Sequence, residues 1–238
     1  MTPHASRLTS HDGAPAPVIA VDGPSGVGKG LVTRWLATRL GFHRLDSGAL
    51  YRILALAGHR RDIDLHDGAA LARLAPALKI RFVGATEDDE AILVDGEDWT
   101  HDVRKESTGA LASLIAVQPP VRAALLQRQR DFREAPGLIA DGRDMGTIVF
   151  PDARLKIFMD ASADERAQRR HKQLSAKGIE ARIATLREEI RARDERDRNR
   201  PIAPLKAAEG AQVVDTTGLP PAGVLEKIEV LLQSSRLV

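Results

Sequence analysis

The chain has 238 residues, of which 43% are hydrophobic and 29% are charged, and this composition excludes a fibrous or intrinsically disordered protein. The length suffices for one sizeable core that carries a smaller insert. The net charge is only +2 and aromatic residues make up 3%, which argues against a nucleic-acid-binding module that stacks bases. The absence of cysteine excludes disulfides and thiolate metal sites, and it fits a cytoplasmic protein.

No segment approaches the roughly 18 continuous apolar residues of a membrane helix, so no membrane partner is expected. Residues 1–17 lack the pattern of a signal peptide and are rich in Pro, Ser, Thr and His, which favours a disordered extension. Residues 234–238 are expected to form a tail. Five histidines lack the spacing of metal ligands, and we interpret them as surface or loop residues: His43, His59, His66, His101 and His171.

The first predicted elements are a strand, a glycine-rich turn and a helix. A short apolar run predicts a buried strand over residues 17–22, and the turn occupies residues 23–30. An apolar stripe predicts a helix over 31–40 that ends at Gly41. A second strand over 42–45 is followed by a helix over 49–57, and Asp46 is expected to cap that helix or to orient Ser47.

In the middle of the chain the hydrophobic pattern changes to a period of two. Residues 79–83 and 91–94 are predicted to form a hairpin with its turn at 86–90, inside a small β-rich insert over about 75–105. Two helices are predicted to follow, over 107–116 and 121–133, separated by a pair of prolines.

The last part of the chain alternates between strands and helices again. Strands are predicted over 137–141, 155–160 and 211–215, and a last helix over 221–233. Between them, Ser162 and Glu165 have the spacing of a capping box that opens a helix ending near 178, and a strongly charged helix occupies 179–199. Because strands and helices alternate, the sequence predicts an α/β protein with a five-stranded parallel sheet flanked by helices.

The glycine-rich turn has the spacing G-x-x-x-x-G-K of a phosphate-binding loop. Glycines let the backbone curl so that several N–H groups face one anion, and the following helix adds its positive N-terminal end. A lysine supplies a mobile charge for the outer phosphates. Because the motif lies between a predicted strand and a predicted helix, we expect ATP to bind to Gly23, Pro24, Ser25, Gly26, Val27, Gly28, Lys29, Gly30 and Leu31.

The residue after Lys29 is Gly30, where many phosphate-binding loops have the Ser or Thr that ligates magnesium. We therefore expect the Mg²⁺ that accompanies ATP to be held through water and by another carboxylate. Asp22 and Asp141 are the two candidates for this carboxylate.

Four separated segments resemble signatures of bacterial cytidylate kinases, which are P-loop nucleoside monophosphate kinases. They are the Gly-Lys-Gly form of the loop, DSGALYR at 46–52, DGRDMGT at 141–147 and RDRNR at 196–200. These segments stand in the family's order within about 18–233, and the insert near 75–105 is similar to the family's enlarged NMP-binding region. The family normally has Thr or Ser where Leu31 stands, so the resemblance implies the backbone cradle but not a hydroxyl contact there.

The resemblance implies a P-loop NTPase-type fold with a cytidylate kinase domain over 18–233. Its core would be formed by 18–60 and 134–233, its NMP-binding insert by about 61–133, and its helical lid by about 162–178. The implied reaction transfers the γ-phosphoryl group of ATP to CMP or dCMP, giving CDP or dCDP and ADP, in pyrimidine metabolism. A monomer with small-molecule substrates and no nucleic-acid partner is expected.

Phosphoryl transfer between two nucleotides needs fixed cations more than proton chemistry, because the acceptor phosphate is already ionised near neutral pH. The resemblance implies that Arg52, Arg143 and Arg200 surround the acceptor phosphate, and that Arg193 and Asp197 lie near the ribose. Alternating charges at i,i+4 spacing in 191–200 also stabilise an exposed helix by themselves, so part of this run is open to a purely structural interpretation.

The choice of base has a chemical logic in which a carboxylate accepts from the N4 amino group of cytosine and repels the O4 of uracil. The resemblance assigns this role to Asp144, with Ser113 and Arg122 on the other polar edge atoms and Ser47 elsewhere in the acceptor site. Ser113 stands in an apolar helix, and the alternative is an ordinary serine that bonds back to the backbone.

The predicted helix that opens at Ser162 carries Arg166 and Arg170 four residues apart on one face. In this fold class the corresponding segment is a lid that closes over ATP and expels water, and the alternative is a solvated basic helix. With the lid included, the cations expected to act in catalysis are Lys29, Arg143, Arg200, Arg166 and Arg170.

Three other functions remain open at this stage. One is a P-loop kinase for UMP or a small hydroxylated metabolite, which the many arginines disfavour because they suit a phosphate acceptor. A GTPase-type switch would require a guanine-reading Asn-Lys-x-Asp segment, which the sequence does not contain. A nucleic-acid-binding module would require a more basic surface than a net charge of +2 indicates.

Overall fold

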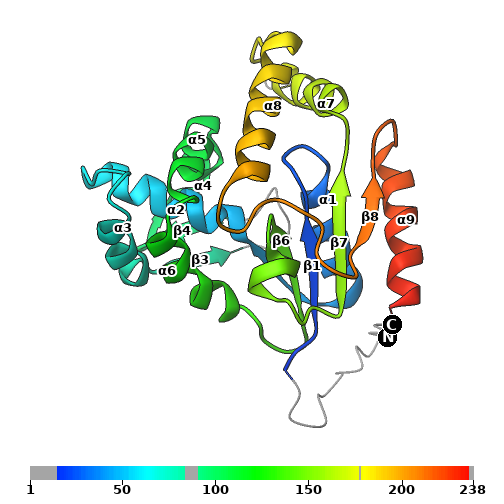
Figure 1. The fold of residues 1–238 in the computed structure, drawn as a ribbon, viewed down its shortest axis with the longest axis horizontal. Helices are drawn as coiled ribbons and strands as arrows, with labels where there is room; N and C mark the ends of the chain where they lie inside the picture. Colours follow the sequence, from blue (N-terminus) through cyan, green and yellow to red (C-terminus); the bar gives the residue numbers. More distant parts are fainter. Residues whose placement is uncertain (1–14, 84–90, 177, 236–238) are drawn as a thin grey trace, which may run out of the picture.

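The computed structural model describes residues 15–83, 91–176 and 178–235 (Figure 1). Most of the expected N-terminal extension, the hairpin turn expected at 86–90 and residues 236–238 of the expected tail lie outside the described residues. The chain already makes contacts before the first strand, since the backbone oxygens of Ala16 and Pro17 accept hydrogen bonds from Arg133 Nε and Leu138 N at 2.6 and 2.9 Å.

The predicted five-stranded parallel sheet is confirmed, with the strand order β2-β6-β1-β7-β8. Its strands are β1 (Val18–Asp22), β2 (His43–Asp46), β6 (Leu138–Gly142), β7 (Leu155–Asp160) and β8 (Gln212–Asp215). β1 is buried along its whole length and pairs with β6 on one side and β7 on the other. The strand order reverses at β1, and ligands of open α/β sheets bind at the carboxyl ends of the strands near such a reversal.

Helices cover both faces of the sheet because the side chains of β1 alternate between two apolar clusters. Val18 and Ala20 belong to the cluster that contains α2 (Ser47–Arg60). Ile19 and Val21 belong to the cluster that contains α1 (Lys29–Leu40) and α9 (Pro221–Ser234). Asp46 caps α2, since its Oδ1 accepts from Ala49 N at 3.1 Å, so the expected capping role is confirmed.

The segment between α2 and β6 contains the predicted hairpin. β3 (Ile80–Val83) and β4 (Ala91–Val94) pair antiparallel, and β5 (Glu97–Asp98) adds a short third strand. Around this sheet lie α3 (Gly68–Leu74), η1 (Ala75–Ala77), α4 (Thr100–Arg104), α5 (Glu106–Ile115) and α6 (Pro119–Arg130). The pattern did not predict α3, α4 or β5, because elements this short show too few repeats to establish a period.

Two helices stand beyond the carboxyl ends of β1, β6 and β7 (Figure 1). They are α7 (Ala163–Ser175) and α8 (Ile183–Asn199), so the charged helix begins at Ile183 and not at 179. Ser162 caps α7 by accepting from Glu165 N at 3.2 Å. The reciprocal bond of a capping box is replaced, since Ser162 N donates to Thr217 Oγ1 and the Glu165 carboxylate pairs with Arg169.

Among the described residues, no single helix combines the length and apolar character that a membrane span needs. Helices α5 and α6 meet these criteria only as a pair, and they are bent by 109° relative to each other. Both contribute side chains to the core of the insert, including Ile115, Val121 and Leu125.

Candidate active site

The glycine-rich turn joins the end of β1 to the start of α1, as the motif requires. Gly26 and Gly28 have φ values of +78° and +96°, a left-handed conformation that favours glycine. A Cβ atom on Gly23 would lie 2.1 Å from the backbone oxygen of Met159, so no other residue fits there. Helix α1 begins at Lys29, two residues before the predicted start, and its amide end therefore faces into the loop.

Lys29 is buried and folded back onto this loop. Its Nζ donates to the backbone oxygens of Gly23 and Pro24 at 3.0 and 2.9 Å and lies 3.8 Å from Asp141 Oδ1. Burial lowers the pKa of Lys29 to about 8, and the neighbouring Arg143 acts in the same direction. Burial likewise raises the pKa of Asp141 to about 6, although the positive charge of Lys29 opposes that shift.

The two expected magnesium ligands have different surroundings. Asp22 is buried, and its two oxygens accept from Met145 N and Gly146 N at 2.8 Å each, which ties β1 to the π-helical turn η2 (Met145–Val149). Burial raises the pKa of Asp22 to about 6 despite these two bonds. Asp141 lines the cavity described next, where Lys29 Nζ lies 3.8 Å from its Oδ1, so Asp141 is the better placed of the two candidates.

The described residues contain no cluster of three or more His, Cys, Asp or Glu side chains that could hold a metal ion alone. A single carboxylate beside a phosphate-binding loop suits Mg²⁺, which keeps most of its water and takes its remaining ligands from substrate phosphates.

A cavity of about 260 Å³ adjoins the phosphate-binding loop and is lined by residues from the ends of β2 and β6 and from α2, α5, α6 and α8. Ser25, Lys29 and Asp141 form its wall on the side of the loop. The structure brings all nine residues expected for the acceptor nucleotide to this one cavity: Ser47, Arg52, Ser113, Arg122, Arg143, Asp144, Arg193, Asp197 and Arg200.

One part of the cavity carries arginines with unused hydrogen-bonding capacity. Arg143 Nε donates to Asp197 Oδ2 at 3.1 Å, which orients its guanidinium group. Arg200 is 8% exposed and its Nε donates to the backbone oxygen of Ala203. Within the described part of the chain, Arg193 Nε and Arg200 Nη2 are buried without a hydrogen-bond partner. Burial lowers the pKa of Arg193 and Arg200, and such donors favour an anionic ligand.

The cavity also contains a buried ion pair between Arg122 Nη2 and Asp144 Oδ2. Ser113 lines the same cavity, and its Oγ donates to the backbone oxygen of Gly109 at 3.0 Å. The bond back to the helix backbone that the alternative expected is therefore present, and the contact of Ser113 with the base stays a prediction. Arg52 also serves a structural contact, because its Nη1 donates to the backbone oxygens of Val103 and Lys105 at 3.1 and 3.0 Å.

The arginines of α7 have unequal surroundings. Arg166 is 2% exposed, forms a bidentate ion pair with Asp194 of α8, and donates to the backbone oxygens of Ala161 and Ser25 at 3.0 and 3.2 Å. These contacts anchor Arg166 between the phosphate-binding loop and α8. Arg170 is partly exposed, and its Nη2 lies 2.9 Å from Glu106 Oε2 on α5.

Two residues of the cavity region were missed by the sequence analysis. Tyr51 lines the cavity, and burial raises its pKa to about 12. Its position inside the DSGALYR segment, directly before Arg52, was a usable signal. Gln129 lies behind the cavity and accepts from Ser47 Oγ at 3.0 Å. No sequence signal singles out Gln129, since the contact joins residues 82 positions apart.

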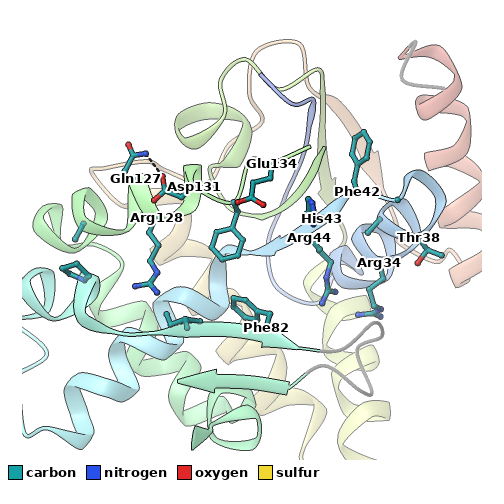
Figure 2. A pocket seen from close by; sticks show the side chains of 16 residues that line it. Arg34, Thr38, Phe42, His43, Arg44, Phe82, Gln127, Arg128, Asp131 and Glu134 are labelled. Carbon is teal, nitrogen blue, oxygen red and sulfur yellow. Dashed lines mark hydrogen bonds between the residues drawn. The ribbon is translucent and has the colours of Figure 1, made fainter. Parts of the chain in front are cut away.

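A larger cavity of about 1180 Å³ lies elsewhere, between α1, β2, β3 and α6 (Figure 2). Phe82 and Phe132 contribute to its lining, and their rings pack edge to face with centroids 6.1 Å apart. Arg128 already uses two of its guanidinium donors there, since its Nη1 and Nη2 donate to the backbone oxygens of Ala75 and Leu78 at 2.7 and 2.6 Å. This cavity contains neither the phosphate-binding loop nor any expected site residue, so the smaller cavity is the candidate active site.

The fold and the site together define a P-loop kinase, in which the loop after the central strand faces an arginine-lined acceptor cavity. The family model described as cytidylate kinase matches residues 19–234. The chain is 57% identical over 204 residues to the cytidylate kinase of Aeromonas salmonicida (strain A449). The aligned region covers 86% of this chain and 88% of that protein. It is 56% identical over 216 residues to the cytidylate kinase of Stutzerimonas stutzeri (strain A1501). This aligned region covers 90% of this chain and 94% of that protein. The chain belongs to the cytidylate kinase family, and the resemblance noted in the four segments is confirmed.

Proposed function

We propose that this protein transfers the γ-phosphoryl group of ATP to CMP or dCMP and releases ADP with CDP or dCDP. The observation that carries the proposal is the convergence of Arg143, Arg193 and Arg200 on a cavity that adjoins the phosphate-binding loop. Within the described residues, Arg193 Nε and Arg200 Nη2 are buried without a hydrogen-bond partner. The names of the relatives support cytidine monophosphates as the acceptors.

In the proposed reaction, an oxygen of the acceptor phosphate attacks the γ-phosphorus of ATP and the bond to the β-phosphate oxygen breaks. The enzyme has to overcome the repulsion between two anions and to hold them in line. Lys29 would leave the loop oxygens of Gly23 and Pro24 and bind the outer phosphates of ATP. Arg52, Arg143 and Arg200 would bind the acceptor phosphate, so the charge that develops between the nucleotides meets fixed cations.

Asp144 would select the base by accepting a hydrogen bond from the N4 amino group of cytosine. Its ion pair with Arg122 compensates the buried charge and fixes the carboxylate in one orientation. Ser113 and Arg122 would contact the other polar edge atoms of the base, and Arg193 with Asp197 would contact the ribose.

Mg²⁺ would accompany ATP and lower the repulsion of its phosphates, held by Asp141 through water. Arg170 would approach the donor phosphates when the lid closes, whereas the contacts of Arg166 favour a role in holding the loop against α8. We further propose that the protein acts as a monomer. We also propose that it acts in the cytoplasm.

The test is a coupled assay of ADP release with Mg-ATP and four acceptors: CMP, dCMP, UMP and AMP. We expect CMP and dCMP to be phosphorylated at least about fivefold faster than UMP or AMP, since one good edge contact discriminates bases by about 1–3 kcal/mol. Comparable rates with all four acceptors would remove the role of Asp144 in base selection. An absence of turnover with every acceptor would contradict the proposed function itself.

A further inference from the structure

Gln129 is a polar residue of α6 that the proposed mechanism does not use, although it touches the acceptor site. Its side chain is 2% exposed, and that of Ser47, which lines the acceptor cavity, is 4% exposed. Ser47 Oγ donates to Gln129 Oε1 at 3.0 Å, and Gln129 Nε2 donates to the backbone oxygen of Leu125 at 3.0 Å. A buried amide therefore connects the backbone of α6 to a hydroxyl group at the wall of the cavity.

The orientation of this amide follows from its two neighbours. If the amide were turned over, its oxygen would face the backbone oxygen of Leu125, and two acceptors would meet in a buried place. Such a contact leaves the amide oxygen without a donor, which costs about 1–3 kcal/mol. The amide nitrogen of Gln129 thus faces the Leu125 backbone oxygen, and the amide oxygen faces the Ser47 hydroxyl group.

The contact is not needed to start the helix on which Ser47 stands. Helix α2 begins at Ser47, but its cap is Asp46, whose Oδ1 accepts from Ala49 N at 3.1 Å. Helix α6 likewise makes its own backbone contacts around Gln129, as Phe132 N donates to the Gln129 backbone oxygen at 3.3 Å. Neither helix therefore depends on the hydrogen bond between Ser47 and Gln129 for its own backbone contacts.

We propose that Gln129 is a positioning residue that holds the proton of the Ser47 hydroxyl group, so that Ser47 presents only lone pairs to the acceptor nucleotide. A serine hydroxyl has one proton to donate and two lone pairs that accept. With its proton directed at Gln129, Ser47 binds a donor group. This inference rests on the proposed function, because it assumes that the cavity holds a nucleoside monophosphate.

The chemistry of that ligand restricts what Ser47 binds. A doubly ionised phosphate carries acceptors only, so it offers no proton to the Ser47 oxygen. The donors of the acceptor nucleotide are the ribose hydroxyl groups and the amino group of cytosine. Ser47 thus recognises the nucleoside part of the acceptor, and Gln129 makes that recognition directional.

The test is a double-mutant cycle in the full chain with Gln129→Met and Ser47→Ala. Methionine has a similar length to glutamine but neither accepts from Ser47 nor donates to Leu125 effectively. We expect Gln129→Met to raise the KM for CMP about fivefold, the factor that one ordinary hydrogen bond supplies, with kcat and the KM for ATP within twofold of wild type. In the Ser47→Ala background, Gln129→Met should have no further effect on the KM for CMP.

Gln127→Met is the matched control, because Gln127 stands on the same helix, is exposed, and its Nε2 donates to the neighbouring Asp131 Oδ1 at 2.8 Å. It should leave all three kinetic parameters unchanged. Measurements with dCMP identify the donor. A rise in KM for CMP alone assigns the ribose 2′-hydroxyl, and an equal rise for dCMP assigns another hydroxyl or the base amino group.

Two results would overturn the role of Gln129: an unchanged KM for CMP in Gln129→Met, or an equal additional rise when Ser47 is already alanine. If the methionine variant does not fold, Gln129→Glu carries the test. In either protonation state the new carboxyl group still accepts a hydrogen bond from Ser47, so the Ser47 proton stays directed away from the ligand. Its KM for CMP should lie within twofold of wild type, and a rise as large as that of Ser47→Ala would overturn the inference. Wild-type protein that fails to phosphorylate CMP would instead contradict the proposed function.

Discussion

At the scale of single residues, the acceptor cavity holds more buried positive charge than its own carboxylates neutralise. Six cationic side chains line it: Lys29, Arg52, Arg122, Arg143, Arg193 and Arg200. Among the described residues, only four carboxylates line it: Asp46, Asp141, Asp144 and Asp197. Leaving a buried donor of a charged group without a partner costs about 1–3 kcal/mol or more. An anion that supplies the missing acceptor removes this cost, and its binding is strengthened accordingly. Binding of phosphate groups would provide the missing partners.

Arg143→Ala should lower kcat with CMP by about 10² or more, because it removes a fixed cation from the charge that develops in the transition state. The fold should survive, since Arg143 makes one ion pair with Asp197 and one bond to the backbone oxygen of Gly142. The measurement is the coupled assay together with thermal unfolding. Arg39→Ala is the control, as Arg39 is 52% exposed and pairs only distantly with Glu229, at 3.7 Å. A turnover of Arg143→Ala within fivefold of wild type would show that the residue is not catalytic.

Asp22 gives a prediction about pH and stability. Its pKa is raised from 3.8 to about 6, so between these values the folded protein holds a proton that the unfolded chain has released. The free energy of unfolding should therefore fall as pH rises from about 4 to about 6, by up to about 3 kcal/mol from this group. Urea unfolding at several pH values should show a smaller fall for Asp22→Asn than for wild type. Equal falls would contradict the raised pKa of Asp22, and Asp141 adds a fall of the same sign to both proteins.

At the scale of elements, the sequence predicted best where one residue pattern determines one structure. The strands β1, β6 and β7 each contain at least three consecutive apolar residues, and the glycine spacing of the loop permits few other conformations. Segments α3 and α4 escaped prediction because five to seven residues hold too few turns to show periodicity. Helix α8 begins later than predicted because its charged residues carry little periodic information about its first turn.

The expected site residues were located by linear motifs, but their partners were not. DGRDMGT and RDRNR fix the positions of Arg143, Asp144 and Arg200 in the chain, and the fold then brings them to one cavity. The pairing of Arg166 with Asp194 and that of Ser47 with Gln129 join residues 28 and 82 positions apart. Such long-range contacts depend on how helices pack, and no local pattern encodes them.

The ion pair between Arg166 and Asp194 fastens α7 to α8. Arg166→Ala would leave Asp194 as an unpaired buried carboxylate, so we expect a loss of about 3–5 kcal/mol in the free energy of unfolding. Arg187→Ala is the control: Arg187 also joins α8 to α7, through Asp164 at 3.1 Å, but both side chains are exposed, and the loss should stay below about 1 kcal/mol. Chemical unfolding of both variants measures the difference. An Arg166→Ala protein with wild-type stability and greatly reduced kcat would instead support a catalytic role for Arg166.

At the scale of the whole molecule, the side chain of Glu106 connects the segment between α2 and β6 to helices α7 and α8. Glu106 begins α5 in the segment between α2 and β6, and its carboxylate lies 2.9 Å from Arg170 Nη2 on α7 and 3.9 Å from Arg193 Nη1 on α8. Both arginines are proposed to bind nucleotides, Arg170 the donor phosphates and Arg193 the acceptor ribose. Glu106 therefore competes with both substrates for the cations they need.

Glu106→Gln should lower the KM for CMP and for ATP, because the arginines lose a competing anion. Glu106 is 63% exposed, so each contact is worth less than about 1 kcal/mol and the decrease should not exceed about fivefold. The difference from wild type should be largest near 0.05 M salt and vanish near 1 M, where charges are screened over about 3 Å. Steady-state kinetics at both ionic strengths measure it, with Glu229→Gln on α9 as a control that removes an acidic charge far from the cleft. A rise in either KM would mean that Glu106 helps to hold the cleft in its binding conformation, and the competition argument would then be wrong.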